Sequence, residues 1–357
     1  MTTSHDAQSQ PPLGQVITDC LDALSDGDHQ RARQLTHQAE KLARAADSLG
    51  RANADLVTGM VEQAAGDTDT AAEKYAAAAD LAQPHLAQSD GICLYLHARK
   101  ELAGLHRSEG RYLEAGRVLL DTLTTIATAE PAPYDLALLH NELGMVSKYS
   151  GDFDQSAASY QTARALLESV LPADDPELAT LFHNIGGLAH ARGDYVAAEG
   201  PARRAVEIRE KALGSNHHDT AIDKAALAPI LLGLDHFEEA EQLLHEALGV
   251  FEQTCGTSHP DYAIALGNLA AVNHQIGRHQ SAEILYQRAL RTLELALGPD
   301  HPDLAPVLTN LAELNHALGN SDLALALSTR ARTLLAAAVR PDHPTLAALA
   351  ERTWLDL

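Results

Sequence analysis

Two stretches decide the fold: AVNHQIGRHQSAEILYQRAL at 271–290 and ELNHALGNSDLALALSTRAR at 313–332, which align with an offset of 42 residues. The same offset leads back to LAHARGDYVAAEGPARRAV at 188–206 through a degenerate copy at 230–248. A fixed period of this length is typical of an array of repeats in which each unit packs only on its neighbours.

A turn residue marks the middle of each copy. It is a glycine in all copies but one, where it is an aspartate: Gly27, Gly66, Gly110, Gly151, Gly193, Asp235, Gly277 and Gly319. Small side chains recur seven positions before each turn residue and five and twelve positions after it. Helices approach closely only where side chains are small, and glycine commonly ends a helix, so each copy is predicted to be a hairpin of two helices.

This pattern resembles the tetratricopeptide repeat, whose small residues and turn glycine are all present. The usual period is about 34 residues, whereas this one is 42. Linkers such as CGTSHPD (255–261) and LGPDHPD (297–303) are similar to those in long repeats of the kinesin light chain type. The resemblance implies an all-α, right-handed superhelical solenoid of eight helix-turn-helix repeats with a C-terminal capping helix.

Four segments are expected along the chain. They are a disordered N-terminal tail at 1–13, irregular units one to three at 14–130, regular units four to eight at 131–343 and a C-terminal capping helix at 344–357. The single tryptophan, Trp354, is predicted to belong to the cap.

The composition limits the possible partners. Lys and Arg total 26 against 49 Asp and Glu, a net charge of −23, so the chain is expected to repel nucleic acid and anionic membrane surfaces. The N-terminus resembles no signal peptide, no apolar run is long enough to span a membrane, and the three cysteines are widely spaced. The cytoplasm is therefore the expected compartment.

Motifs for catalysis or cofactor binding are missing from the sequence: it contains no P-loop, no GxGxxG, no HExxH and no GxSxG. His259, His301 and His343 each precede a proline in a linker, which favours extended backbone at the start of a helix. We therefore interpret them as turn residues and expect neither a metal nor a cofactor.

Polar side chains recur on the first helix of each hairpin, which lines the concave groove in such arrays. Asn184, Asn268 and Asn310 lie nine positions before a turn residue, and Asn141 is one position out of phase. A second series lies three positions before the turn residue: Arg107, Lys148, His190, His274 and His316. His183 precedes Asn184 and is expected in the same groove.

Two interpretations of these residues stay open. By resemblance, Asn184, Asn268 and Asn310 would hold the main chain of an extended peptide, and the basic side chains would pair with carboxylates. Alternatively, the same side chains bond between repeats and stabilise the superhelix. The unit around Asp235 also has two interpretations, because Ala226, Pro229 and Leu232 either mark a decayed repeat or form an apolar pocket.

Three functions are compatible with the sequence. The first is a non-catalytic scaffold that binds a protein or peptide segment in its groove. The second is a peptide- or ligand-sensing regulator that acts in trans on a signalling ATPase or transcription factor, because repeats of this type often follow nucleotide-binding switch domains in high-GC bacteria. The third is an enzyme with a site inside the superhelix.

Overall fold

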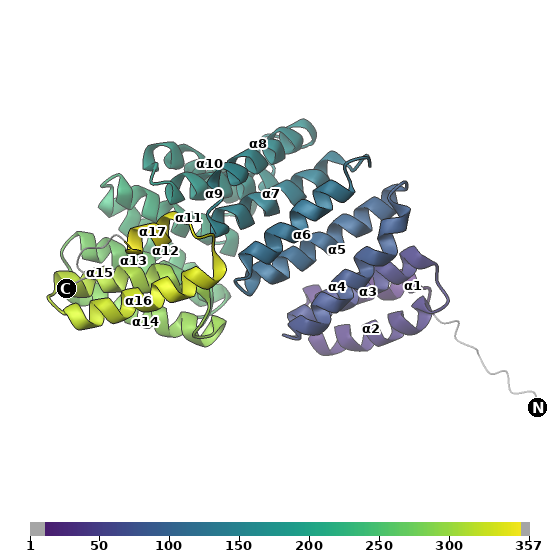
Figure 1. Ribbon diagram of the computed structural model, residues 1–357, viewed down its shortest axis with the longest axis horizontal. Coiled ribbons are helices and arrows are strands. Elements are labelled where there is room, and N and C mark those ends of the chain that lie inside the picture. Colours follow the sequence, from purple (N-terminus) through teal and green to yellow (C-terminus); the bar gives the residue numbers. More distant parts are fainter. Residues whose placement is uncertain (1–10, 351–357) are drawn as a thin grey trace, which may run out of the picture. The chain divides into compact units, whose positions relative to one another are not determined.

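The computed structural model describes residues 11–350, which fold into seventeen α-helices and two short 3-10 helices without a strand. Sixteen of the α-helices pack pairwise in chain order as eight hairpins (Figure 1). The expected all-α array of eight helix-turn-helix repeats is therefore confirmed. The chain divides into two compact units. Unit 1 comprises Met1–Ser108 and Glu114–Asp135, and unit 2 comprises Glu109–Leu113 and Leu136–Leu357.

Unit 1 contains the first three hairpins and a short 3-10 helix. Its helices are α1 (Leu13–Ser25), α2 (His29–Ala43), α3 (Ser48–Ala64), α4 (Thr68–Ala82), η1 (Gln83–His85), α5 (Ser89–Ser108) and α6 (Tyr112–Thr125), of which Tyr112 and Leu113 belong to unit 2.

Unit 2 contains the other five hairpins, apart from the first three residues of the helix that begins at Pro133, and a final short helix. Its helices are α7 (Pro133–Ser150), α8 (Phe153–Val170), α9 (Pro176–Ala191), α10 (Tyr195–Leu213), α11 (His218–Gly233), α12 (Phe237–Thr254), α13 (Pro260–Gln275), α14 (His279–Leu297), η2 (Pro302–Leu304), α15 (Ala305–Ala317), α16 (Ser321–Ala338) and α17 (Pro344–Ala350).

The recurring small residues form the contacts within each hairpin. Every residue five positions after a turn residue is completely buried, from Ala32 in the first hairpin to Ala324 in the last. The residues twelve positions after the turn residue and seven before it are buried as well. Large side chains fill the space beside them, among them Tyr75, Tyr160 and Tyr286 on the second helices. The predicted hairpin packing is therefore confirmed.

Turn and cap residues fix where the helices end. All eight predicted turn residues have positive φ, including Asp235 at 61°, the one non-glycine in this conformation among residues 11–350. An aspartate directly after the turn glycine often begins the second helix, since its carboxylate accepts a hydrogen bond from a backbone N–H three residues on. Asp152 does so for Gln155 at 3.1 Å, and Asp194 for Ala197 at 3.0 Å.

Linker histidines cap the next helix in unit 2. The Nδ1 atoms of four of them accept a hydrogen bond from the backbone N–H two residues on, each at 3.2 Å: His217, His259, His301 and His343. This bond requires a neutral ring with its proton on Nε2. The prediction that the linker histidines are turn residues is confirmed, and their specific role is that of an N-cap.

The long repeat period lengthens the second helix of each hairpin. In unit 2 these helices have 18 or 19 residues, whereas α2 and α4 have 15 and α6 has 14. The difference is about one helical turn.

The last helix, α17, packs on α16, and its Leu349 is completely buried. The predicted capping residue Trp354 lies outside the described residues. Within 11–350, no helix combines the length and the apolar run needed to cross a membrane.

Candidate functional site

A cavity of about 400 Å³ lies inside unit 2. Its wall comes mainly from the first helices of four hairpins, α7, α9, α11 and α15, with contributions from η2 and the C-terminal segment. The volume falls within the range of known ligand pockets. Much of the wall is apolar: Tyr149, Phe153, Ala226, Pro229, Pro306 and Leu335. Ala226 and Pro229 therefore lie where the pocket interpretation of the degenerate unit requires them.

A basic side of this cavity is formed by three residues of neighbouring hairpins. Lys148 on α7 and His183 and His190 on α9 all belong to the wall. The Lys148 ammonium lies 4.5 Å from the centre of the Tyr149 ring. Burial, followed by the positive charge of Lys148, lowers the pKa of His190. The stacking of α7 on α9 thus brings together three of the nine residues that the sequence analysis assigned to the groove.

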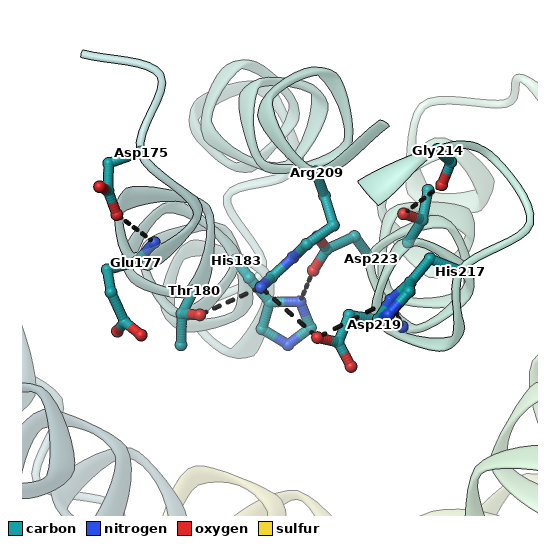
Figure 2. A network of polar contacts seen from close by, with 10 residues as sticks. Asp175, Glu177, Thr180, His183, Arg209, Gly214, His217, Asp219 and Asp223 are labelled. Atoms are coloured by element: carbon teal, nitrogen blue, oxygen red, sulfur yellow. Dashed lines mark hydrogen bonds and ion pairs between the residues drawn. The ribbon is translucent and has the colours of Figure 1, made fainter. Parts of the chain in front are cut away.

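A buried network fixes the orientation of His183 (Figure 2). Its Nδ1 lies 2.8 Å from Asp223 Oδ1 on α11, and the other oxygen of Asp223 accepts a hydrogen bond from Arg209 Nε on α10 at 3.0 Å. Arg209 also donates to the Thr180 hydroxyl on α9 at 3.0 Å. Because Asp223 is a carboxylate held by Arg209, Nδ1 of His183 is the donor, and Nε2 is the ring nitrogen left for a ligand.

The C-terminal segment closes the cavity against the turn between α7 and α8. The Arg340 backbone N–H donates to Ser150 O at 3.0 Å, and the Arg340 guanidinium bonds the carboxylate of Asp152. His343 packs edge-on against Phe153 with ring centres 6.3 Å apart. The first and last hairpins of unit 2 are thereby joined, so the cavity is walled on several sides.

A smaller cavity of about 250 Å³ adjoins the first and shares Tyr149, His183 and Ala226 with it. Asn268 on α13 belongs to its wall, and the Asn268 amide donates a hydrogen bond to Ala225 O at 3.1 Å. Ala225 precedes Pro229 by four residues, and proline has no N–H to bond that carbonyl. The amide of one hairpin therefore satisfies the backbone group that a proline leaves unpaired in the previous hairpin.

We expect a coupling between Asn268 and Pro229. Asn268→Ala should lower the free energy of unfolding by about 1–3 kcal/mol, since it leaves a half-buried carbonyl without a donor. In a Pro229→Ala background the N–H of residue 229 can bond Ala225 O, so the same change should cost clearly less. Urea unfolding of the four proteins in this double-mutant cycle measures the difference. Equal costs in both backgrounds would show that the amide does not serve this carbonyl.

The remaining predicted groove residues are dispersed. Asn184 on α9 is buried, and its amide donates to Asn141 Oδ1 on α7 at 3.0 Å. On α15, Asn310 is half-buried and His316 is exposed. On α13, the ring centre of His274 lies 5.6 Å from that of His279. The larger cavity has none of the predicted residues Asn184, His274, Asn310 and His316 in its wall. Arg107 is in unit 1. Their roles in binding stay predictions.

Sequence reasoning missed the partners that orient the site. Asp223 and Arg209 occupy positions without a recurring pattern, so nothing marked them as a pair. The contribution of Asp303, whose carboxylate accepts a hydrogen bond from the Tyr112 hydroxyl, was also missed, because Tyr112 lies 191 residues away in the sequence. Among the described residues, no cluster of three side chains is arranged to hold a metal ion.

Comparisons with known proteins agree with the observed architecture. The chain is similar to the solved structure of the apo form of RapI, with 14% identity over 78% of this chain and 97% of that one and a TM-score of 0.63. It is similar to NprR solved in complex with its cognate peptide NprX, with 13% identity, 98% and 84% coverage and a TM-score of 0.59. Kinesin light chain repeats from Podospora anserina share 20% identity over 56% of this chain and 96% of that one, with a TM-score of 0.45.

No curated protein matches the chain. The family model for the tetratricopeptide repeat matches residues 134–211, 177–248, 224–294 and 285–337, which together cover more than half of the sequence. The chain therefore belongs to the tetratricopeptide repeat family.

Proposed function

We propose that the protein is a non-catalytic scaffold that binds a peptide, or an extended segment of a protein, inside unit 2. The cavity of about 400 Å³ carries this proposal, because it combines an apolar wall with a few polar groups held in fixed positions. The apolar wall suits a hydrophobic side chain of the ligand. His183, oriented by Asp223, offers one fixed polar contact.

The adjoining smaller cavity extends this site along the array. His183 belongs to both walls, and Asn268 faces the smaller one. A segment of several residues that runs from one cavity to the other would pass both side chains. Asn184 and Asn310 belong to the same series on neighbouring first helices, and we keep them as candidate contacts of a longer segment.

Similarity to NprR supports a peptide as the ligand and favours a second function. The NprR structure contains its cognate peptide, and its likeness extends over 98% of this chain. By this analogy the protein would be a regulator, in which peptide binding changes the interaction with a signalling ATPase or a transcription factor. A peptide-induced change in compaction, measured by small-angle X-ray scattering, would distinguish such a regulator from a static scaffold.

The proposed site predicts the effect of filling the cavity. A random peptide library displayed on phage would be selected on the full chain, and the Kd of the best peptide measured by fluorescence anisotropy. Ala226→Trp should weaken this peptide at least about tenfold, since the indole occupies the space that the ligand needs. Ala158→Trp, at an exposed position on α8, is the matched control and should leave the Kd unchanged.

Two results would contradict the proposal. A selection that yields no binding peptide would argue against the function, and equal Kd values for both tryptophan variants would place the peptide elsewhere. Asn268→Ala combined with Asn310→Ala then tests the amide series, because a groove role for these residues requires weaker peptide binding by the variant that remains folded.

A further inference from the structure

We propose that a seam between distant segments of unit 2 is the gate through which a ligand enters the larger cavity. The seam consists of two contacts between a linker and a turn. In one, the linker before α17 lies on the turn between α7 and α8. In the other, the linker that contains η2 lies on the turn at residues 109–113. This inference rests on the binding function proposed above and adds a control of access to the same site.

The first seam contact combines an ion pair with close packing of a ring. The Arg340 guanidinium bonds the carboxylate of Asp152, 188 positions away in the sequence. The His343 ring packs edge-on against Phe153. It also lies directly over the turn, since a methyl group at Gly151 would be 2.7 Å from Cδ2 of His343. The glycine therefore allows the linker to lie close to the turn.

The second seam contact repeats this arrangement one hairpin earlier. Pro302 lies over the turn glycine Gly110, where a methyl group would be 2.5 Å from Cγ of Pro302. The Tyr112 hydroxyl donates a hydrogen bond to the carboxylate of Asp303. Glycine and linker residue are 192 positions apart in both contacts. A contact that recurs at a constant spacing follows from the constant rotation between stacked repeats.

The seam forms one side of the cavity. Tyr112, Phe153, Pro302, Asp303 and His343 all belong to its wall. Two pairs within this set contact each other across the seam, Tyr112 with Asp303 and Phe153 with His343. Separation of the seam therefore opens this side of the cavity, while α9 and α11, which pack on each other, keep the rest of the wall in place.

The seam is held more weakly than the helices around the cavity. The side chains of Arg340 and Asp152 are 42% and 37% exposed, and an ion pair at such exposure adds little to stability. Residues 339–343, which carry the contact, belong to no helix. In contrast, the ion pair that joins α9 and α11 contains Asp223, which is only 2% exposed. Opening of the seam therefore costs less than separation of these helices.

A disulfide that locks the seam tests the gate in the full chain. A Cβ atom at position 151 would lie 3.2 Å from Cα and 3.1 Å from Cγ of His343. The two Cβ atoms therefore come close to the separation of about 3.5–4.5 Å that a disulfide requires. Gly151→Cys and His343→Cys are combined with Cys93→Ser and Cys255→Ser, because these two cysteines are accessible whereas Cys20 is buried. The oxidised form is compared with the reduced form of the same variant, so the strain of a cysteine at a positive φ is common to both.

The measurement uses N-phenyl-1-naphthylamine as the ligand, a neutral aromatic dye that fluoresces in apolar surroundings. Its binding is followed by stopped-flow fluorescence. We expect the disulfide to slow both association and dissociation at least about tenfold and to leave the Kd nearly unchanged, because a gate controls entry and exit but not the bound state. Reduction with dithiothreitol should restore both rates. Equal rates in the two forms would show that the ligand enters elsewhere and would overturn the inference.

Arg340→Ala changes the gate in the opposite direction. Loss of this ion pair should raise both rates by up to about fivefold at an unchanged Kd, since an exposed pair contributes little. Arg203→Ala is the matched control. Arg203 pairs with Glu239 at a similar exposure, 42% for both side chains, but this pair lies outside the seam, so both rates should stay the same. If both arginine variants change the rates equally, the inference is overturned.

Ala226→Trp distinguishes a failure of the gate from a failure of the proposed function. The indole should weaken binding of the dye at least about tenfold, because it fills the cavity. If the Kd of the dye is unchanged, the dye does not occupy the cavity, and the proposed function fails together with the gate. If the indole weakens binding but the oxidised and reduced seam variants bind at equal rates, the binding function stands and only the gate is overturned.

Discussion

Replacing Asp223 by Ala is expected to lower the free energy of unfolding by about 3–5 kcal/mol, the cost of removing one partner from a buried ion pair. Asp223 is only 2% exposed and accepts from both His183 and Arg209. Arg209 is only 11% exposed, so water cannot readily replace the carboxylate that it loses. After the substitution, its guanidinium keeps the Thr180 hydroxyl as a partner, and its nearest carboxylate is that of Asp219 at 3.8 Å. Denaturant unfolding followed by circular dichroism measures the change.

A surface pair in the same unit is the control for Asp223. Glu239 bonds Arg203 through both oxygens, at 2.6 and 2.9 Å, but both side chains are 42% exposed. Glu239→Ala should therefore cost no more than about 1 kcal/mol, since water replaces the lost contact. If the two substitutions cost the same, burial does not determine the strength of the His183–Asp223–Arg209 network. Asp223→Ala should also weaken ligand binding, because His183 would lose the carboxylate that fixes its orientation.

Gly144→Ala is expected to lower the free energy of unfolding by about 1–3 kcal/mol, although alanine favours a helix more than glycine does. A methyl group at position 144 on α7 would lie 2.4 Å from Cε1 and 2.5 Å from Cδ1 of Tyr160. Tyr160 on α8 is 1% exposed, and a methyl group this close requires a shift of the Tyr160 ring or of the two helices. Such a shift also strains the hydrogen bond from the Ser156 hydroxyl to Gly144 O.

Gly249→Ala should have the opposite effect. Gly249 lies inside α12, and a methyl group there would meet no atom of a neighbouring helix within 4 Å. The helix preference of alanine then acts alone, so stability should rise by up to about 1 kcal/mol. Thermal unfolding of the two variants in parallel measures both changes in stability, which should have opposite signs. Destabilisation by both substitutions to the same extent would rule out close packing on Tyr160 as the cause at Gly144.

The repeat architecture could be predicted because its causes are local and recur. Gly151 or Asp235 at a turn, and Ala198 or Ala282 five positions after one, each satisfy the same steric requirement in every copy. Eight copies of one requirement make the pattern visible in a single sequence. The linker histidines were recognised as turn residues for the same reason, although their capping hydrogen bonds became apparent only in the structure.

The site was predicted only in part, since a recurring position in the repeat does not reveal which residues of other hairpins surround it. Lys148 and His190 occupy equivalent slots and meet in one cavity, whereas His274 and His316 occupy the same slots on later hairpins and lie outside its wall. The Asn184 amide bonds a side chain that is one position out of phase, and the Asn268 amide bonds a carbonyl left unpaired by Pro229. Each partner belongs to the neighbouring hairpin, so its identity depends on how the hairpins stack.

The sequence by itself determined the all-α class, the eight hairpins and their turn residues, because close helix packing and helix termination depend on residues within one repeat. Only the tertiary structure decided where the cavity lies and which side chains surround it. Its wall joins residues from Tyr112 to Thr345, and the contact of Arg340 with Ser150 and Asp152 that closes it spans almost all of unit 2. Contacts between residues so far apart follow from the accumulated rotation of successive repeats, which no single repeat records.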